Sequence, residues 1–157
     1  AKHGRSLFVL DDVTALQELT PEVRAKALHL FPPRPAEARH LLPGWADWNG
    51  SAHFRGEDPK EGALVTFWLK EPSAEPVKVA ITTADGRPVA NLTAPGLAGL
   101  GRVSWDLKPT KDLRTEYGGL PAGRHVAPGE YRVTVSCGEA RSSQTLKVTA
   151  APGVETR

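Results

Sequence analysis

The sequence of 157 residues contains no methionine and one cysteine, and its charges nearly cancel. A single cysteine, Cys137, excludes an internal disulfide, and we interpret it as a small core residue. A formal net charge of +2 gives no strong basic field, which argues against nucleic-acid and anionic-membrane binding. No run of about 18 apolar residues occurs, so we expect no membrane span.

The absence of methionine also bears on the origin of the chain, because a primary translation product begins with methionine. The first residues lack the n-region and the apolar h-region of a signal peptide. We therefore expect a processed product, a fragment or a deliberately shortened chain, from which any targeting segment has been removed.

Glycine and proline are abundant, with 15 and 14 residues, and they favour turns and short strands over helices. From residue 63 onward, apolar and polar residues alternate in short runs, which is typical of strands with one buried face. We predict strands over Leu64–Leu69, Val77–Thr83, Val89–Leu92, Arg102–Leu107, Glu130–Cys137 and Ala140–Val148. Asp85-Gly86 and Gly138-Glu139 predict turns between neighbouring strands. Six short antiparallel strands in about 85 residues indicate an all-β fold, an immunoglobulin or fibronectin-III-like β-sandwich, in which Tyr131 could cap a corner.

The part before residue 63 is irregular and interrupted by prolines. Ser6–Leu10 has the length and apolar character of a buried strand, but no hairpin partner follows it. Thr20 before Pro21 predicts an N-cap and a short helix over about 21–27. Leu28–Phe31 predicts a short extended piece, and the prolines at 32–35 predict a stiff polyproline-like segment. Residues 36–62 are expected to form a long loop.

Several of these segments carry a resemblance to a known family. Lys2–Asp12 resembles the last propeller strand of bacterial sortilin-like, BNR-repeat "glycosyl hydrolase" proteins. Leu19–Val23, followed by His29–Ala36, is similar to the linker after that propeller. Gly62–Leu69, Asp85-Gly86-Arg87, Gly101–Leu107 and Pro128–Val133 resemble the Ig-like module that follows, a pattern also seen in flagellar-hook capping proteins.

The resemblance covers residues 2 to about 150 and implies four parts. These are a final propeller strand over 1–12, a linker with a short helix and a Trp-containing loop over 13–62, an Ig-like β-sandwich over 63–150, and a tail over 151–157. It implies a secreted or periplasmic bacterial protein whose larger propeller precedes this chain. Leu7, Phe8, Val9 and Leu10 would then pair with a blade of that propeller, in the same polypeptide or in a separate chain.

The function implied is that of a non-catalytic structural or interaction module at the C-terminal end of the propeller protein. The aspartate-box motif of such repeats is absent here, and we expect no catalytic residue, metal site or cofactor in this chain. An alternative is that His3, Asp11 or Asp12 completes a hydrolase site built mostly in the propeller. Together with His29 these residues were also considered as metal ligands, but their spacing matches no known motif.

A further alternative is a carbohydrate-binding module. Indole faces next to polar side chains suit sugar rings, whose C–H faces pack on the aromatic surface. The candidate residues are Trp45, Asp47, Trp48, Asn49 and His53. The competing interpretation is that both tryptophans anchor a long loop. Pro109–Ala127, between two predicted strands, is open to both a recognition-loop and a plain-connection interpretation.

Overall fold

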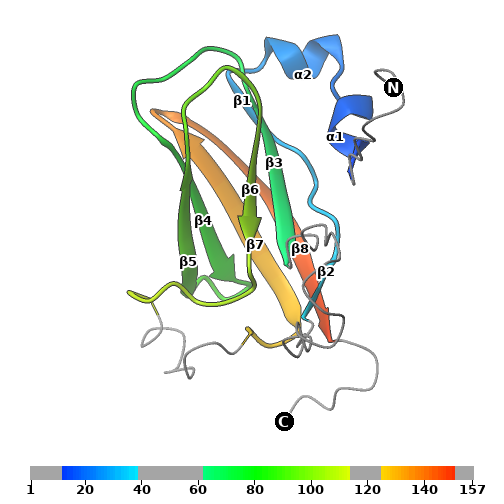
Figure 1. Ribbon diagram of the computed structural model, residues 1–157, viewed down its shortest axis with the longest axis vertical. Coiled ribbons are helices and arrows are strands. Elements are labelled where there is room, and N and C mark those ends of the chain that lie inside the picture. The colour runs from blue at the N-terminus through cyan, green and yellow to red at the C-terminus, as the bar shows by residue number, and fades with distance from the viewer. Residues whose placement is uncertain (1–11, 39–61, 114–124, 151–157) are drawn as a thin grey trace, which may run out of the picture.

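The computed structural model describes residues 12–38, 62–113 and 125–150. It is mostly β structure in two sheets, one of them curled into a half-barrel, with very short helices (Figure 1). In chain order the elements are α1 (Thr14–Gln17), α2 (Pro21–Ala25), β1 (Leu28–Leu30), β2 (Ala36–Ala38), β3 (Ala63–Leu69), β4 (Val77–Thr83), β5 (Pro88–Ala94), β6 (Gly99–Trp105), β7 (Gly129–Cys137) and β8 (Ala140–Ala150). Within the described ranges, no helix is long and apolar enough to cross a membrane.

The strands form a three-stranded sheet in the order β1-β3-β6 and a five-stranded sheet in the order β2-β8-β7-β4-β5. Neighbouring strands are antiparallel except β2 and β8, which run parallel. The segment 28–38 therefore contributes β1 to the smaller sheet and β2 to the larger one. Both strands lie upstream of residue 63, in the part that the sequence assigns to a linker.

The two sheets share one hydrophobic core, to which the inward faces of the alternating strands contribute. On β3 and β4 the alternate residues Val65, Phe67, Leu69, Val77, Val79 and Ile81 are buried. On β7, Tyr131, Val133 and Val135 are buried, and Cys137 is partly buried and packs against the core. The period-2 pattern thus predicted the buried face of β7 correctly.

Local signals for turns and caps are confirmed as well. Thr20 accepts a hydrogen bond from the Val23 backbone N–H at 3.4 Å and caps α2, with Pro21 at the first helical position. The β4–β5 hairpin turns at Asp85-Gly86, where Gly86 has a φ of +88° that suits glycine. The helix α1 was not predicted, since its four residues carry no capping side chain at Val13.

The bounds of β6 differ from the prediction at both ends. The strand begins at Gly99, where glycines weaken the sequence signal for a strand. Gly101 is needed there because a Cβ at this position would overlap the ring of Phe67. At the other end the strand stops at Trp105, and Leu107 adopts a φ of 58° while its side chain stays buried. Leu107 is thus inward, as predicted, but lies outside the strand.

Candidate functional site

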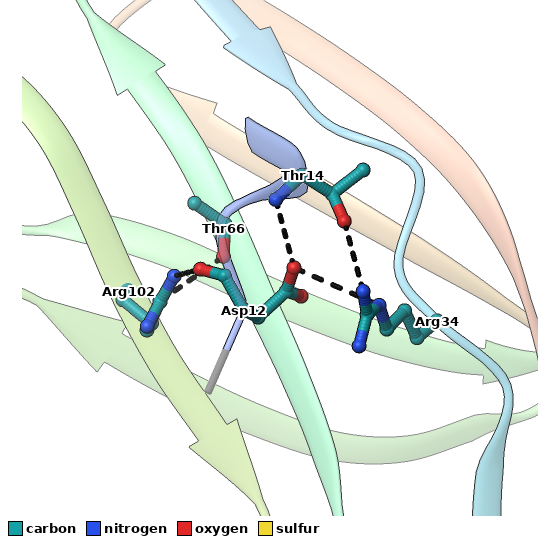
Figure 2. A network of polar contacts seen from close by, with 5 residues as sticks. All are labelled: Asp12, Thr14, Arg34, Thr66 and Arg102. Carbon is teal, nitrogen blue, oxygen red and sulfur yellow. Dashed lines mark hydrogen bonds and ion pairs between the residues drawn. The ribbon is translucent and has the colours of Figure 1, made fainter. Parts of the chain in front are cut away.

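The first segment that the structure describes crosses the outer face of the smaller sheet, and polar side chains hold it there. Figure 2 shows this group, which we call the junction: Asp12, Thr14, Arg34, Thr66 and Arg102. Its residues come from the start of α1 and the segment just before it, the crossing between β1 and β2, and strands β3 and β6. The junction therefore joins parts of the chain that are far apart in sequence.

The carboxylate of Asp12 organises the incoming segment. Its Oδ1 accepts a hydrogen bond from the Thr14 backbone N–H at 2.9 Å, an Asx-type turn that starts α1. Arg34 Nε lies 3.6 Å from the same oxygen, and Arg34 Nη2 donates to Thr14 Oγ1 at 3.3 Å. The hydrogen bonds from Thr14, followed by the charges of Arg34 and Arg102, hold the pKa of the Asp12 carboxyl below its ordinary value. This carboxyl is therefore ionised near neutral pH and unsuited to donate a proton there.

Arg102 attaches the same segment to the sheet. It lies on the outward face of β6, and its Nη2 donates to the Asp12 backbone carbonyl at 2.9 Å. Its Nε donates to Thr66 Oγ1 at 3.3 Å, across the β3–β6 pair where the two residues are register partners. Thr66 is buried, so it is a fixed acceptor that orients the guanidinium toward the incoming chain. Arg102 thus fixes the backbone of Asp12 relative to strands β3 and β6.

Arg34 is held in place by the crossing that carries it. The prolines at 32, 33 and 35 restrict the backbone of this crossing to extended conformations. Its two ends are tied to the larger sheet: Leu30 N donates to Ser142 Oγ at 3.0 Å, and Thr149 Oγ1 donates to the Ala36 carbonyl at 3.3 Å. Phe31 N also donates to the Thr66 carbonyl at 3.1 Å. A stiff segment anchored at both ends gives Arg34 a defined position.

The energies of these contacts indicate what the junction does. The Arg34 side chain is 64% exposed, so its ion pair with Asp12 contributes about 0–1 kcal/mol. The hydrogen bond from Arg102 is charge-assisted but also at an exposed site. Such contacts stabilise the fold only slightly, whereas together they define the direction in which the chain reaches the sheet. The arrangement orients a segment, and it includes no nucleophile paired with a base.

A second ordered region lies at the base of the Pro109–Ala127 connection. Tyr131 donates from its hydroxyl to the Ala127 carbonyl at 2.6 Å, four residues upstream. The rings of Tyr131 and Trp105 pack edge to face, 5.8 Å apart, and Trp105 Nε1 donates to the Lys108 carbonyl at 2.8 Å. Val126 N donates to the Leu107 carbonyl at 2.7 Å and closes the base. Residues 114–124 of this connection lie outside the described residues.

Two hollows in the described surface are candidate ligand sites. One of about 530 Å³ is lined by Leu92, Ser104, Trp105, Asp106, Lys108, Pro109 and Thr110. Asp106 and Lys108 pair with each other there at 3.9 Å, and the indole of Trp105 is buried, which leaves no ring face for a sugar. The other, of about 320 Å³, includes Cys137 and lies between α2 and the β7–β8 turn. Its lining also includes Lys70, Glu71 and Ser73.

The sugar-binding candidates Trp45, Asp47, Trp48, Asn49 and His53 lie outside the described residues, as do Leu7, Phe8, Val9 and Leu10, which were expected to pair with a propeller blade. Of the residues weighed for a metal, the structure describes Asp12 and His29. His29 packs edge to face on Phe31, with ring centroids 4.9 Å apart, and burial lowers the pKa of its imidazole. In the described part of the chain, no group of three or more His, Cys, Asp or Glu residues could hold a metal ion.

Sequence reasoning singled out Asp12 but not its partners. Arg102 falls within a predicted strand, and alternation cannot tell which side chains of a strand receive a contact from another segment. Arg34 stands among prolines, and its position depends on the crossing between the two sheets. Predicting the junction would have required knowledge of the strand order, because this order brings β6 and the crossing to opposite sides of β3.

Comparison with known proteins adds no relative. No protein-family model matches the chain, and no curated protein matches its sequence.

Proposed function

We propose that this chain is a non-catalytic structural or interaction module, an Ig-like or fibronectin-III-like sandwich at the C-terminal end of a larger secreted or periplasmic β-propeller protein. Its task would be to hold a defined orientation relative to the propeller that precedes it. The observation that carries the proposal is the junction. Asp12, at the end of the segment expected to close the propeller, is fixed to both Arg34 and Arg102.

The strand order supports the Ig-like part of the proposal. If the strands are lettered along the chain, β1, β3 and β6 take the places of strands A, B and E in one sheet. The strands β8, β7, β4 and β5 take the places of G, F, C and C′ in the other. The bond from Tyr131 to Ala127 is of the tyrosine-corner kind that recurs in such sandwiches.

The magnitude of the junction contacts supports orientation rather than stabilisation as its role. A flexible linker would leave two domains free to reorient, which is the usual behaviour when little surface is shared. Here the backbone carbonyl and the carboxylate of Asp12 are held from opposite sides, by β6 and by the proline crossing. Two fixed points on one residue restrict rotation of the incoming chain more than one contact would.

The test uses the native gene product. Its intact mass should show that polypeptide precedes Ala1. Small-angle X-ray scattering of the full-length protein should then show a compact particle. The double variant Arg34→Ala/Arg102→Ala should give a larger radius of gyration and a broader distance distribution.

The matched control is Arg132→Ala, which removes an exposed arginine from β7 in the other sheet. It should leave the scattering profile unchanged. A native protein that starts at Ala1 would refute the proposal, and so would a full-length double variant that scatters like the wild type.

A further inference from the structure

We infer that the outer face of the smaller sheet, beside the junction, is the surface on which the preceding part of the same polypeptide docks. This inference rests on the proposed function, because it requires that a domain precedes this chain. The contact surface would be centred on three exposed apolar side chains, Val13, Leu16 and Leu100, which we call the docking patch.

The first reason is exposure. Val13 is 41% exposed, Leu16 51% and Leu100 40%. Large apolar side chains that gather on one face of a protein commonly mark an interaction site, whereas isolated ones need no explanation. The question is therefore whether these three belong to one face.

The geometry of helix α1 places Val13 and Leu16 on one face. Residues three apart lie on the same side of a helical turn, so Leu16 follows the direction of Val13 at the N-cap. Ala15, between them, is 5% exposed. The segment thus buries one small side chain and leaves two large apolar side chains exposed to solvent.

The sheet register places Leu100 on the same face. Leu100 pairs with Trp68 of β3, and Arg102 pairs with Thr66, so Leu100 and Arg102 both lie on the outward side of β6. Arg102 in turn holds the backbone of Asp12, the residue just before Val13. The docking patch therefore continues directly from the junction, with β6 at one edge of the sheet order.

The position of the junction identifies the occupant. A domain attached ahead of Asp12 starts beside this face, because Asp12 is fixed on it. A tethered domain meets a nearby apolar surface at a high effective concentration, so even a small contact is populated. The charged rim suits this arrangement, since Arg34 and Arg102 border the apolar side chains and are held by Asp12 and Thr14.

The test is hydroxyl-radical footprinting of the full-length native protein, with mass-spectrometric readout of each side chain. Leu97 is the internal reference, because it is 70% exposed and lies in the loop between β5 and β6. If the patch is covered, Val13, Leu16 and Leu100 should be labelled far less than their exposed fractions relative to Leu97 imply. Leu16→Asp in the full-length protein should restore labelling at Val13 and Leu100, and Leu97→Asp should leave the protection unchanged.

The outcomes separate this inference from the proposed function. If polypeptide precedes Ala1 but the three side chains are labelled in proportion to their exposure, the docking inference fails and the proposed function stands. If nothing precedes Ala1, the proposed function fails first. Protection that disappears on dilution would assign the patch to a second copy of the chain, and this would also overturn the inference.

Discussion

At the outer face of the smaller sheet, charged side chains hold the chain, whereas at the base of the connection after β6 aromatic side chains hold it. Arg34 and Arg102 act in partly solvated positions, where each contact contributes little free energy. Trp105 and Tyr131 act in the core, where their contacts remove large apolar surfaces from water. The comparison shows that the buried aromatic contacts of Trp105 and Tyr131 stabilise the fold. The exposed polar contacts of the junction instead define the direction in which the chain reaches the sheet.

The largest expected effect on stability comes from removing the aromatic contact between Trp105 and Tyr131. Trp105→Ala removes a side chain that is 1% exposed and also its bond to the Lys108 carbonyl. We expect a loss of about 3–5 kcal/mol in the free energy of unfolding, measured by urea denaturation with circular dichroism. Trp68→Ala is the matched control, since Trp68 is only partly buried on the outer face, and its loss should be smaller. Equal losses would refute the contrast between the two regions.

The next effect tests the close approach of β6 to the core. In Gly101→Val the new side chain would collide with the ring of Phe67, which cannot move freely in a packed interior. We expect a loss of about 1–3 kcal/mol, with a lower thermal midpoint in calorimetry. Ser104→Ala, on the outward face of the same strand, should change the midpoint little. A Gly101→Val protein as stable as the wild type would contradict the packing described.

A smaller effect on stability is expected from removing the hydroxyl group of Tyr131 alone. Tyr131→Phe keeps the ring on Trp105 and removes the hydroxyl that donates to the Ala127 carbonyl. We expect a loss of about 0.5–1.5 kcal/mol. Hydrogen exchange should rise at Val126, whose backbone N–H closes the base of the connection. Unchanged stability and unchanged exchange would show that the corner is held by ring packing alone.

The smallest effect on stability is expected at the junction. Arg34→Ala should lower the free energy of unfolding by less than about 1 kcal/mol, because the ion pair is largely exposed. It should nevertheless speed hydrogen exchange at the Thr14 backbone N–H, which donates to Asp12. A loss of several kcal/mol in the free energy of unfolding would mean that the junction stabilises the fold as strongly as the Trp105–Tyr131 contact does.

Acid should act on the junction through Asp12. The pKa of its carboxyl is lowered from 3.8, first by the Thr14 backbone N–H and then by the Thr14 side chain and the two arginines. A lowered pKa in the folded state means that this contribution is complete above 3.8 and is lost as the pH falls through the folded value. Asp12→Asn should remove this part of the acid dependence of exchange at Thr14. Arg132→Ala should keep it.

Much of the fold could be predicted because the strands of the larger sheet obey simple alternation. The sequence bounds of β4 agree with the structure at both ends, since Val77, Val79 and Ile81 alternate with less buried residues. The strand β2 was not predicted, because three residues with two alanines carry no alternating signal. It is a strand only because Val148 and its neighbours on β8 offer backbone partners.

The candidate site was predictable only in part, for a related reason. Asp12 was among the candidate site residues, and Arg102 fell within a predicted strand. The bond between them spans 90 positions in sequence and depends on the packing of the incoming segment over β3. Local pattern says which way a side chain points, but not what other segment passes in front of it.

By itself the sequence determined most of the strands and the hairpin turns that join neighbouring ones, because these follow from interactions between residues close along the chain. Only the tertiary structure decided that residues 28–38 join both sheets and that Asp12 is held between Arg34 and Arg102. Those features depend on backbone partners and charges brought together from distant positions, which no local pattern encodes.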